Sequence, residues 1–389
     1  MKKVFGLFAL TATCALAAAS LSSCGTSSDK IGFIFLHDEN SSYDKNFIEA
    51  AKDVCNELNV TFMSRIGVTE GDDCYTAAEE LVNQGCKAVF ADSFGHEPYL
   101  IKAAKKYPDV EFCHATGTRA HTEGLDNYHN AFASIYQGRY VTGVAAGLKL
   151  NAMIEAGTIT AEQAVMGYVG AYPYAEVVSG YTSFYLGAKS VCPSVTMSVR
   201  YTNSWYSIEG EASAATALID EDKAVIISQH ADSLGAPGVC EEKGVPNVFY
   251  NGTNDNLDTY LIASRINWRP YFRYMINSTL KGEKMNSDWY GTIENGAVEV
   301  LTLNETLAAS GTKAALDKVI SDLKGGLEVF NTANFTVKGE TVTSYEADVN
   351  DDPAFTKDTQ VIENGVFKES TYRSAPYFDM RIDGIIEKE

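Results

Sequence analysis

Short apolar runs alternate with amphipathic stretches along this chain, and that order constrains its fold more than any other feature. The first apolar run, residues 31–36, has the length of a buried strand, and residues 47–58 follow it with apolar side chains at helical spacing. The alternation then continues through three runs of strand length and two helical stretches, at residues 60–64, 74–82, 88–91, 99–107 and 110–113. Strict alternation of this kind predicts a parallel, doubly wound α/β sheet.

The same alternation restarts after a long helical stretch at residues 136–154. Its strand-length runs and helical stretches lie at residues 165–169, 181–190, 195–201, 209–219, 224–228 and 247–250, with a short helix around Val239. The chain of 389 residues is long enough for two such units. Two similar α/β halves predict a two-lobed clamshell that closes on a solute, each lobe being a doubly wound parallel sheet flanked by helices.

We expect the chain to cross between the lobes more than once. The predicted segments of the N-terminal lobe are residues 31–143 plus about 265–300, and those of the C-terminal lobe are residues 144–264 plus about 301–335. The residues after about 325 are rich in Thr, Asn and Asp, with alternating apolar positions around Gly339, and residues 336–389 are the predicted C-terminal strap. This composition predicts a hairpin within an irregular C-terminal strap.

The N-terminal segment has the features of an export signal. A charged start, Met1-Lys-Lys3, precedes an apolar run at residues 4–20 that is too short to span a bilayer well. The run ends in Leu21-Ser-Ser-Cys24, which resembles a bacterial lipobox. No later apolar run approaches the roughly 20 residues that a membrane-spanning helix needs.

The lipobox resemblance implies that residues 1–23 are a lipoprotein signal peptide, that Cys24 is acylated after cleavage, and that residues 24–30 form a polar tether. We therefore expect a protein anchored by lipid at the outer face of the cytoplasmic membrane, on the cell surface or in a periplasm. The alternative is an ordinary signal peptide followed by an incidental cysteine.

Charge and cysteine content narrow the partners. The formal net charge of −20 disfavours nucleic acid and anionic lipid surfaces. Six of the eight cysteines lie beyond the signal and Cys24, and their spacing fits no zinc pattern: Cys55, Cys74, Cys86, Cys113, Cys192 and Cys240. An exported protein could pair them. Burial in the core is an equal alternative for Cys86 and Cys113. The histidines show no metal spacing, so we expect no metal.

The residues that follow the predicted strands are the candidate ligand-binding residues, because parallel sheets bind ligands beyond the carboxyl ends of their strands. Aromatic and acidic side chains recur there: Tyr43, Phe94, Trp205 and Trp268, with Asp38, Asp44, Glu176, Asp232 and Asp255. Aromatic faces suit a flat ring, and carboxylates accept hydrogen bonds from N–H and O–H groups. Lys and Arg are scarce among the residues at these strand ends, which disfavours phosphates and free carboxylates as ligands. The pattern predicts a neutral or weakly cationic heterocycle, such as a base or nucleoside.

Each candidate also has a purely structural alternative. The four aromatic residues could pack in the core, and this alternative is strongest for Phe94 and Trp268. Asp232 and Asp255 could cap helices. The chain lacks a Gly-x-Ser-x-Gly elbow, a Walker loop and a Gly-x-Gly-x-x-Gly turn after a strand. A cleft without catalytic or phosphate-binding motifs favours a receptor over an enzyme, and we expect no cofactor.

Several segments, in order from about residue 93 to residue 271, resemble one family. They are Ser93-Phe-Gly with the stretch 107–117, residues 136–147, Gly167-Tyr-Val-Gly with Glu176-Val-Val, residues 187–193, Asn203-Ser-Trp-Tyr with Gln229-His-Ala-Asp-Ser, and Asn267-Trp with Tyr271. Together they resemble the basic membrane protein, or PnrA-like, family of substrate-binding lipoproteins of ABC importers.

The resemblance implies a clamshell like a type I periplasmic binding protein that delivers a purine nucleoside or purine base to an ABC permease and its ATPase, as a monomer. It implies that Tyr43 and Trp205 stack on the purine, and that Asp255, with Asp232 nearby, holds the sugar or base edge. Tyr43-Asp44 departs from the family's usual Phe-Asn, and Ile266 replaces its usual lysine. These departures lean towards free purines. The alternatives are a receptor for another flat solute, such as a flavin, and a surface nucleosidase using Asp38 and Asp255.

Overall fold

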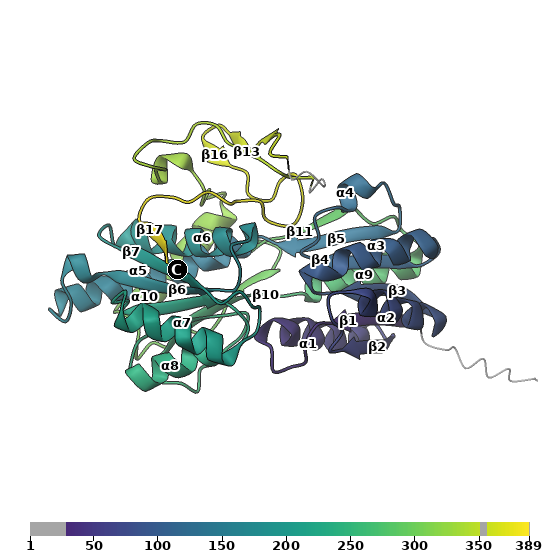
Figure 1. The fold of residues 1–389 in the computed structure, drawn as a ribbon, viewed down its shortest axis with the longest axis horizontal. Coiled ribbons are helices and arrows are strands. Elements are labelled where there is room, and N and C mark those ends of the chain that lie inside the picture. Colours follow the sequence, from purple (N-terminus) through teal and green to yellow (C-terminus); the bar gives the residue numbers. More distant parts are fainter. Residues whose placement is uncertain (1–28, 351–355, 389) are drawn as a thin grey trace, which may run out of the picture.

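The computed structural model describes residues 29–350 and 356–388 and divides them into two lobes, each built on one sheet (Figure 1). The predicted signal peptide, Cys24 and most of the predicted tether lie outside the described residues. Both sheets are flanked by helices, as the alternation of the sequence predicts. Within the described ranges, no helix combines the length and the hydropathy that crossing a membrane requires.

The first lobe contains an entirely parallel sheet of six strands in the order β11-β5-β4-β3-β1-β2. The strands are β1 (Lys30–Phe35), β2 (Thr61–Ile66), β3 (Cys86–Ala91), β4 (Glu111–Ala115), β5 (Tyr128–Ala133) and β11 (Asp288–Gly291). Its helices are α1 (Ser42–Glu57), α2 (Asp72–Asn83), α3 (Glu97–Lys106), α4 (Ala120–Glu123) and α9 (Arg269–Lys281), with a 3₁₀ turn, η1 (Phe94–His96). Helices α1 and α9 pack together, as do α2 and α3.

Strand β1 shows why this sheet is covered on both faces. Phe33 and Ile34 are both fully buried, although successive side chains of a strand point to opposite faces. Phe33 belongs to the core under α1 and α9, where its ring lies 5.3 Å from that of Phe272. Ile34 belongs to the core under α2 and α3. A continuous apolar run is therefore required, since neither face of the strand meets water.

The second lobe contains a seven-stranded sheet in the order β12-β10-β9-β8-β6-β7-β17. The strands are β6 (Val165–Gly170), β7 (Thr196–Tyr201), β8 (Ile226–His230), β9 (Asn247–Tyr250), β10 (Tyr260–Ile266), β12 (Val298–Val300) and β17 (Ile385–Lys388). Only β12 pairs antiparallel with its neighbour. The helices are α5 (Ile135–Glu155), α6 (Ala175–Val191), α7 (Ile208–Asp220), α8 (Gly235–Lys243) and α10 (Thr312–Lys324), with 3₁₀ turns η2 (Ala161–Gln163) and η3 (Thr332–Asn334).

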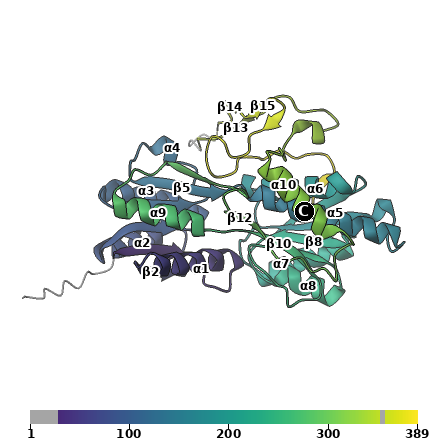
Figure 2. The same cartoon turned by 180° about the vertical axis from the view of Figure 1, so that it is seen from behind.

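Helices α5 and α6 pack at very short range through glycines. A Cβ atom on Gly143 would lie 2.0 Å from the Phe184 carbonyl oxygen, and one on Gly187 would lie 2.1 Å from that of Tyr140. Helix α5 thus belongs with the second sheet, and the lobe boundary that we expected at residue 143 falls inside it. The chain leaves the first sheet after β5, returns to it after β10, and leaves again after β11 (Figure 2).

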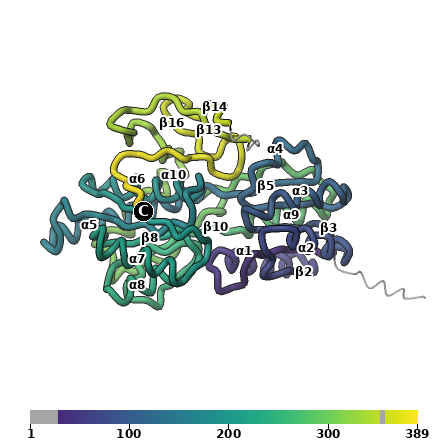
Figure 3. Tube along the Cα trace, in the orientation of Figure 1, coloured from purple at the N-terminus to yellow at the C-terminus, as the bar shows by residue number. Residues whose placement is uncertain are grey.

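The C-terminal segment lies across the second lobe and reaches the first, as the yellow part of the tube shows (Figure 3). It contains two small antiparallel pairs, β13 (Glu346–Ala347) with β14 (Thr359–Gln360) and β15 (Ile362–Glu363) with β16 (Val366–Phe367). Ser374 donates from its backbone N–H and its hydroxyl to Asp288 of the first lobe, both at 2.7 Å. Ser179 of the second lobe donates to Glu369 at 2.6 Å. The segment therefore contacts both lobes.

Candidate ligand-binding cleft

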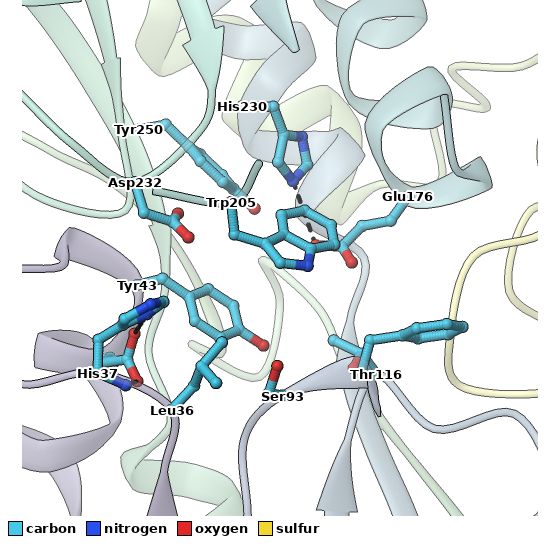
Figure 4. A pocket seen from close by; sticks show the side chains of 12 residues that line it. Leu36, His37, Tyr43, Ser93, Thr116, Glu176, Trp205, His230, Asp232 and Tyr250 are labelled. Carbon is cyan, nitrogen blue, oxygen red and sulfur yellow. Dashed lines mark hydrogen bonds and ion pairs between the residues drawn. The ribbon is translucent and has the colours of Figure 1, made fainter. Parts of the chain in front are cut away.

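A cavity opens between the lobes at the carboxyl ends of their strands (Figure 4). Its space, including the part open to solvent, is about 390 Å³. The first lobe contributes Leu36, His37, Tyr43, Asp44, Ser93, Phe94 and Thr116. The second lobe contributes Glu176, Trp205, His230, Asp232 and Tyr250. Among these described lining residues, none is Lys or Arg, the side chains that most often pair with phosphates and carboxylates.

Aromatic rings from both lobes face the cavity. Tyr43 and Trp205 project towards the same space from opposite sides (Figure 4). The Tyr43 hydroxyl donates to the Asp92 carbonyl oxygen at 2.8 Å, which fixes its ring, while the Trp205 ring is supported by Tyr172 at 5.3 Å. Such an arrangement can hold a flat ring between two faces.

An aromatic contact spans the two lobes at the rim of the cavity. The ring of Phe94 lies 5.6 Å from that of Tyr174. Both side chains are about two-fifths exposed, so this contact sits at the edge of the cleft rather than in its interior. The lobes also meet where the Ser42 N–H donates to the Asp232 carbonyl oxygen at 3.2 Å.

Asp44 is a buried carboxylate with a full set of partners. It accepts from the His37 backbone N–H at 2.7 Å and from the Ser41 hydroxyl at 2.6 Å, and its other contact is the His37 ring at 3.3 Å. Burial acts to raise the pKa of Asp44, but the hydrogen bonds from His37 and Ser41 outweigh it, so the pKa lies below its usual value. The hydrogen bond to Asp44 in turn raises the pKa of His37.

Asp232 is a buried carboxylate in the opposite situation. It is 5% exposed, and within the described part of the chain no group donates a hydrogen bond to its side chain. Burial raises its pKa well above the usual value, and the negative charges of Asp44, Glu211 and Glu176 raise it further. The carboxylate faces the cavity (Figure 4), so a bound molecule can supply the missing donor.

Glu176 and His230 form a pair on the wall of the second lobe. The Nε2 atom of His230 lies 3.2 Å from Oε1 of Glu176. Burial lowers the pKa of His230, which favours the neutral ring. Next to them, the buried hydroxyl of Tyr250 has no hydrogen-bond partner in the described part of the molecule.

The backbone adopts the left-handed conformation just after three of the strands that end near the cleft. Thr116, Asn203 and Asn251 follow β4, β7 and β9 with φ angles of 64°, 55° and 58°. Asparagine tolerates this left-handed conformation, but a β-branched threonine adopts it rarely. Strain at a cavity-lining residue such as Thr116 is typical of functional sites, where the surrounding structure holds an unfavourable conformation.

The structure brings six of the nine predicted ligand-binding residues to the cavity: Tyr43, Asp44, Phe94, Glu176, Trp205 and Asp232. It places the other three elsewhere. Trp268 is 1% exposed and stacks on Phe47 in the first-lobe core, at 4.3 Å between ring centroids. Asp38 is exposed and accepts from the backbone N–H of Asn40 at 2.9 Å. Asp255 is exposed in the loop after β9 and does not line the cavity.

Sequence reasoning missed six lining residues: Leu36, His37, Ser93, Thr116, His230 and Tyr250. His230 and Tyr250 are the last residues of β8 and β9, whereas the predicted binding residues all come after the ends of the predicted strands. Across the described residues, no group of three His, Cys, Asp or Glu side chains could hold a metal ion. All six cysteines in that part of the chain are buried and free of disulfides.

Two α/β lobes around a cleft with facing aromatic rings and carboxylates define a solute-binding protein. Solved structures share this fold: the ABC transporter solute-binding protein from Conexibacter woesei has a TM-score of 0.63 at 16% identity, over 77% of this chain and 97% of that one. A solute-binding protein from Aeropyrum pernix has a TM-score of 0.66 at 12% identity, over 77% and 92% of the two chains. At these identities the likeness shows the fold alone.

The chain belongs to the PnrA-like family of ABC transporter substrate-binding proteins, whose model matches residues 35–332. A purine-binding protein of Brucella abortus is 34% identical over 281 residues, which is 68% of this chain and 73% of that protein. A putative ABC transporter glucose-binding protein of Haloferax volcanii is 31% identical over 220 residues, 56% of this chain and 52% of that protein. The C-terminal segment beyond residue 332 lies outside the family match.

Proposed function

We propose that this protein captures a purine base or purine nucleoside in the cleft and delivers it to an ABC permease and its ATPase. It does so as a monomer, tethered through a lipid on Cys24 to the outer face of the cytoplasmic membrane. The observation that carries the proposal is the Asp232 carboxylate, which is buried, faces the cavity and lacks a donor among the described residues.

The chemistry of the cavity supports a purine. The rings of Tyr43 and Trp205 offer two faces for a flat heterocycle. Asp232 accepts hydrogen bonds, and purines carry ring N–H groups and exocyclic amines that donate them. The lack of lysine or arginine among the described lining residues disfavours a nucleotide, whose phosphates need cationic partners. The name of the Brucella relative supports the same class of ligand.

The first experiment is a ligand screen on the purified protein. Adenine, guanine, hypoxanthine, adenosine, guanosine and inosine are added singly, with glucose and riboflavin as the competing solutes. A purine should raise the free energy of unfolding by about 2.7 kcal/mol at a concentration one hundredfold above its Kd. Mass spectrometry of the natively purified protein should find a purine carried through purification. No stabilisation by any base or nucleoside would contradict the proposal.

Two further measurements address the anchor and the competing enzyme. A Cys24→Ala variant should no longer incorporate a labelled fatty acid and should leave the membrane fraction, whereas a Cys55→Ala variant, which loses a buried thiol, should keep the label. Nucleosides that are incubated with the purified protein should remain intact, as measured by chromatography. Release of free base would instead indicate a nucleosidase.

A further inference from the structure

Three polar side chains form a hydrogen-bonded series that leads from the interior of the second lobe to the cavity. The hydroxyl of Tyr168 on β6 lies 3.4 Å from Nδ1 of His230, and Nε2 of the same ring lies 3.2 Å from Oε1 of Glu176. Tyr168 is fully buried and His230 is 2% exposed, whereas Glu176 reaches the cavity wall (Figure 4). The chain therefore connects a residue that no ligand can touch to one that faces the ligand.

The order of donors along this chain follows from the chemistry of its ends. Burial raises the pKa of Tyr168 to about 12, so its hydroxyl keeps its proton and needs an acceptor. Nδ1 of His230 is that acceptor, which leaves the ring proton on Nε2. Nε2–H then donates to the Glu176 carboxylate, which can only accept while ionised. Each group thus has one compatible role.

The surrounding packing leaves the His230 ring little freedom. A Cβ atom on Gly180 of α6 would lie 2.8 Å from Nδ1 of His230 and 3.2 Å from the Tyr168 hydroxyl, so the helix backbone closes one side. The Tyr250 ring closes another side at 4.4 Å. The buried Arg139 guanidinium lies 3.6 Å from the centre of that Tyr250 ring and supports it from beyond. The geometry of the chain is therefore fixed before any ligand enters.

We propose that His230 is a positioning residue for ligand recognition. As the Nε2–H tautomer, which the Tyr168 hydroxyl and the Glu176 carboxylate both favour, it holds one oxygen of Glu176 and leaves the other free to accept from the ligand. This inference rests on the proposed function, because it concerns the orientation of one hydrogen-bond acceptor, the Glu176 carboxylate, in the proposed ligand-binding cleft. The described residues provide Glu176 with no other hydrogen-bond donor, so the orientation of its carboxylate depends on His230.

Two amide substitutions separate the ring nitrogens. In His230→Gln the side-chain nitrogen can occupy the place of Nε2 and still donate to Glu176, whereas in His230→Asn it reaches only the place of Nδ1. With adenine and inosine as probes in calorimetry, His230→Asn should weaken binding about tenfold, the loss of one hydrogen bond to a charged group. His230→Gln should stay within about threefold of the wild type. The same two substitutions at His121, which lies outside the cavity, are the controls.

A second measurement does not depend on the ligand. The ¹⁵N spectrum of the wild-type protein should show His230 with a protonated Nε2 and an unprotonated Nδ1. In Tyr168→Phe, which removes only the hydroxyl, the Nδ1 signal should shift because this nitrogen loses its donor, while Nε2 stays protonated towards Glu176. Equal weakening in the two His230 variants, or an Nδ1–H tautomer in the wild type, would overturn the inference. If neither probe binds the wild type, the proposed function fails, and the ¹⁵N spectrum still decides whether the tautomer is right.

Discussion

Asp44 and Asp232 face the same cleft from opposite lobes, and their carboxylates are held in opposite ways. Asp44 accepts hydrogen bonds from His37 and Ser41, which place its pKa below the usual value. Asp232 has no donor among the described residues, and burial places its pKa well above the usual value. The residue type is the same, so the difference comes entirely from the surroundings.

The same contrast extends to the rest of the two walls. In the first lobe, three cavity-lining hydroxyls donate hydrogen bonds within that lobe. The Tyr43 hydroxyl donates to the Asp92 carbonyl oxygen at 2.8 Å, and the Ser93 hydroxyl donates to the Glu70 carboxylate at 2.6 Å. The Thr116 hydroxyl donates to the Ala115 carbonyl oxygen at 2.5 Å. In the second lobe, the Tyr250 hydroxyl is left without a partner among the described residues, as is the Asp232 carboxylate. The hydroxyls of the first wall thus have hydrogen-bond partners before a ligand binds. The second wall holds the groups that lack a hydrogen-bond partner, and we expect the hydrogen-bond donors of the ligand to bind there.

The largest effect on binding is expected for Asp232→Asn. A hydrogen bond to a charged group contributes about 1.5–3 kcal/mol, so purine affinity should fall by about 10- to 150-fold. The free energy of unfolding should stay the same or rise, because an unpaired buried carboxylate is removed. Calorimetry and chemical denaturation measure the two effects. Asp255→Asn, at an exposed aspartate outside the cavity, is the control, and unchanged affinity in Asp232→Asn would remove the contrast between the walls.

Aromatic substitutions test the contrast next. Trp205→Ala should weaken purine binding by about 1–3 kcal/mol, through lost stacking and lost apolar burial. Tyr43→Phe keeps its ring and removes a hydroxyl already used by Asp92, so it should leave affinity within about threefold. Fluorescence titration can follow both variants, because Trp268 and Trp289 remain as reporters away from the cavity. Unchanged affinity in Trp205→Ala would mean that the ligand binds elsewhere.

The smallest expected effect is on stability, in Asp44→Asn. Loss of its charge-assisted hydrogen bonds should lower the free energy of unfolding by about 1–2 kcal/mol at neutral pH. The depressed pKa of Asp44 contributes stability above the unfolded-state pKa of about 3.9, and this contribution disappears as the pH falls through the folded-state pKa. The stability difference between wild type and variant should therefore shrink below about pH 4.

The contribution of Asp232 to the free energy of unfolding should change with pH in the opposite direction. Its raised pKa costs stability as the pH rises above about 3.9, so Asp232→Asn should gain stability relative to the wild type with increasing pH. Denaturation of the three proteins across a pH series gives both slopes. Two slopes of the same sign would show that the two carboxylates are not held differently.

The sequence predicted the sheets well because their strands are buried on both faces and therefore consist of uninterrupted apolar residues. Residues 31–36, for example, nearly coincide with β1. It predicted the cleft only in part, because position after a strand does not say where a side chain points. Trp268 follows β10, yet it caps α9, which returns to the first lobe and carries the indole into the core. The loop that holds Asp255 leaves that carboxylate in solvent.

Other features had no local signal at all. Nothing in residues 385–388 indicates that they pair with β7, nearly two hundred residues earlier in the chain. The hydrogen-bond partners that distinguish Asp44 from Asp232 also come from tertiary contacts. Ser41 and His37 are close in sequence to Asp44, but their geometry depends on how α1 begins, with Ser41 as its N-cap. The sequence alone therefore identifies candidate acidic residues of the cleft but does not show which of them have hydrogen-bond donors.

Strand β17 has a consequence for how this molecule is made. The second lobe begins with α5 at Ile135, but its sheet gains its last strand only when Ile385–Lys388 pair with β7. Contacts between such distant segments form slowly, because a long loop must close before the pairing is rewarded. Until then β7 is an open edge that can pair with another chain. A truncation before residue 385, or a fusion that holds this segment away, should therefore first appear as aggregation during expression.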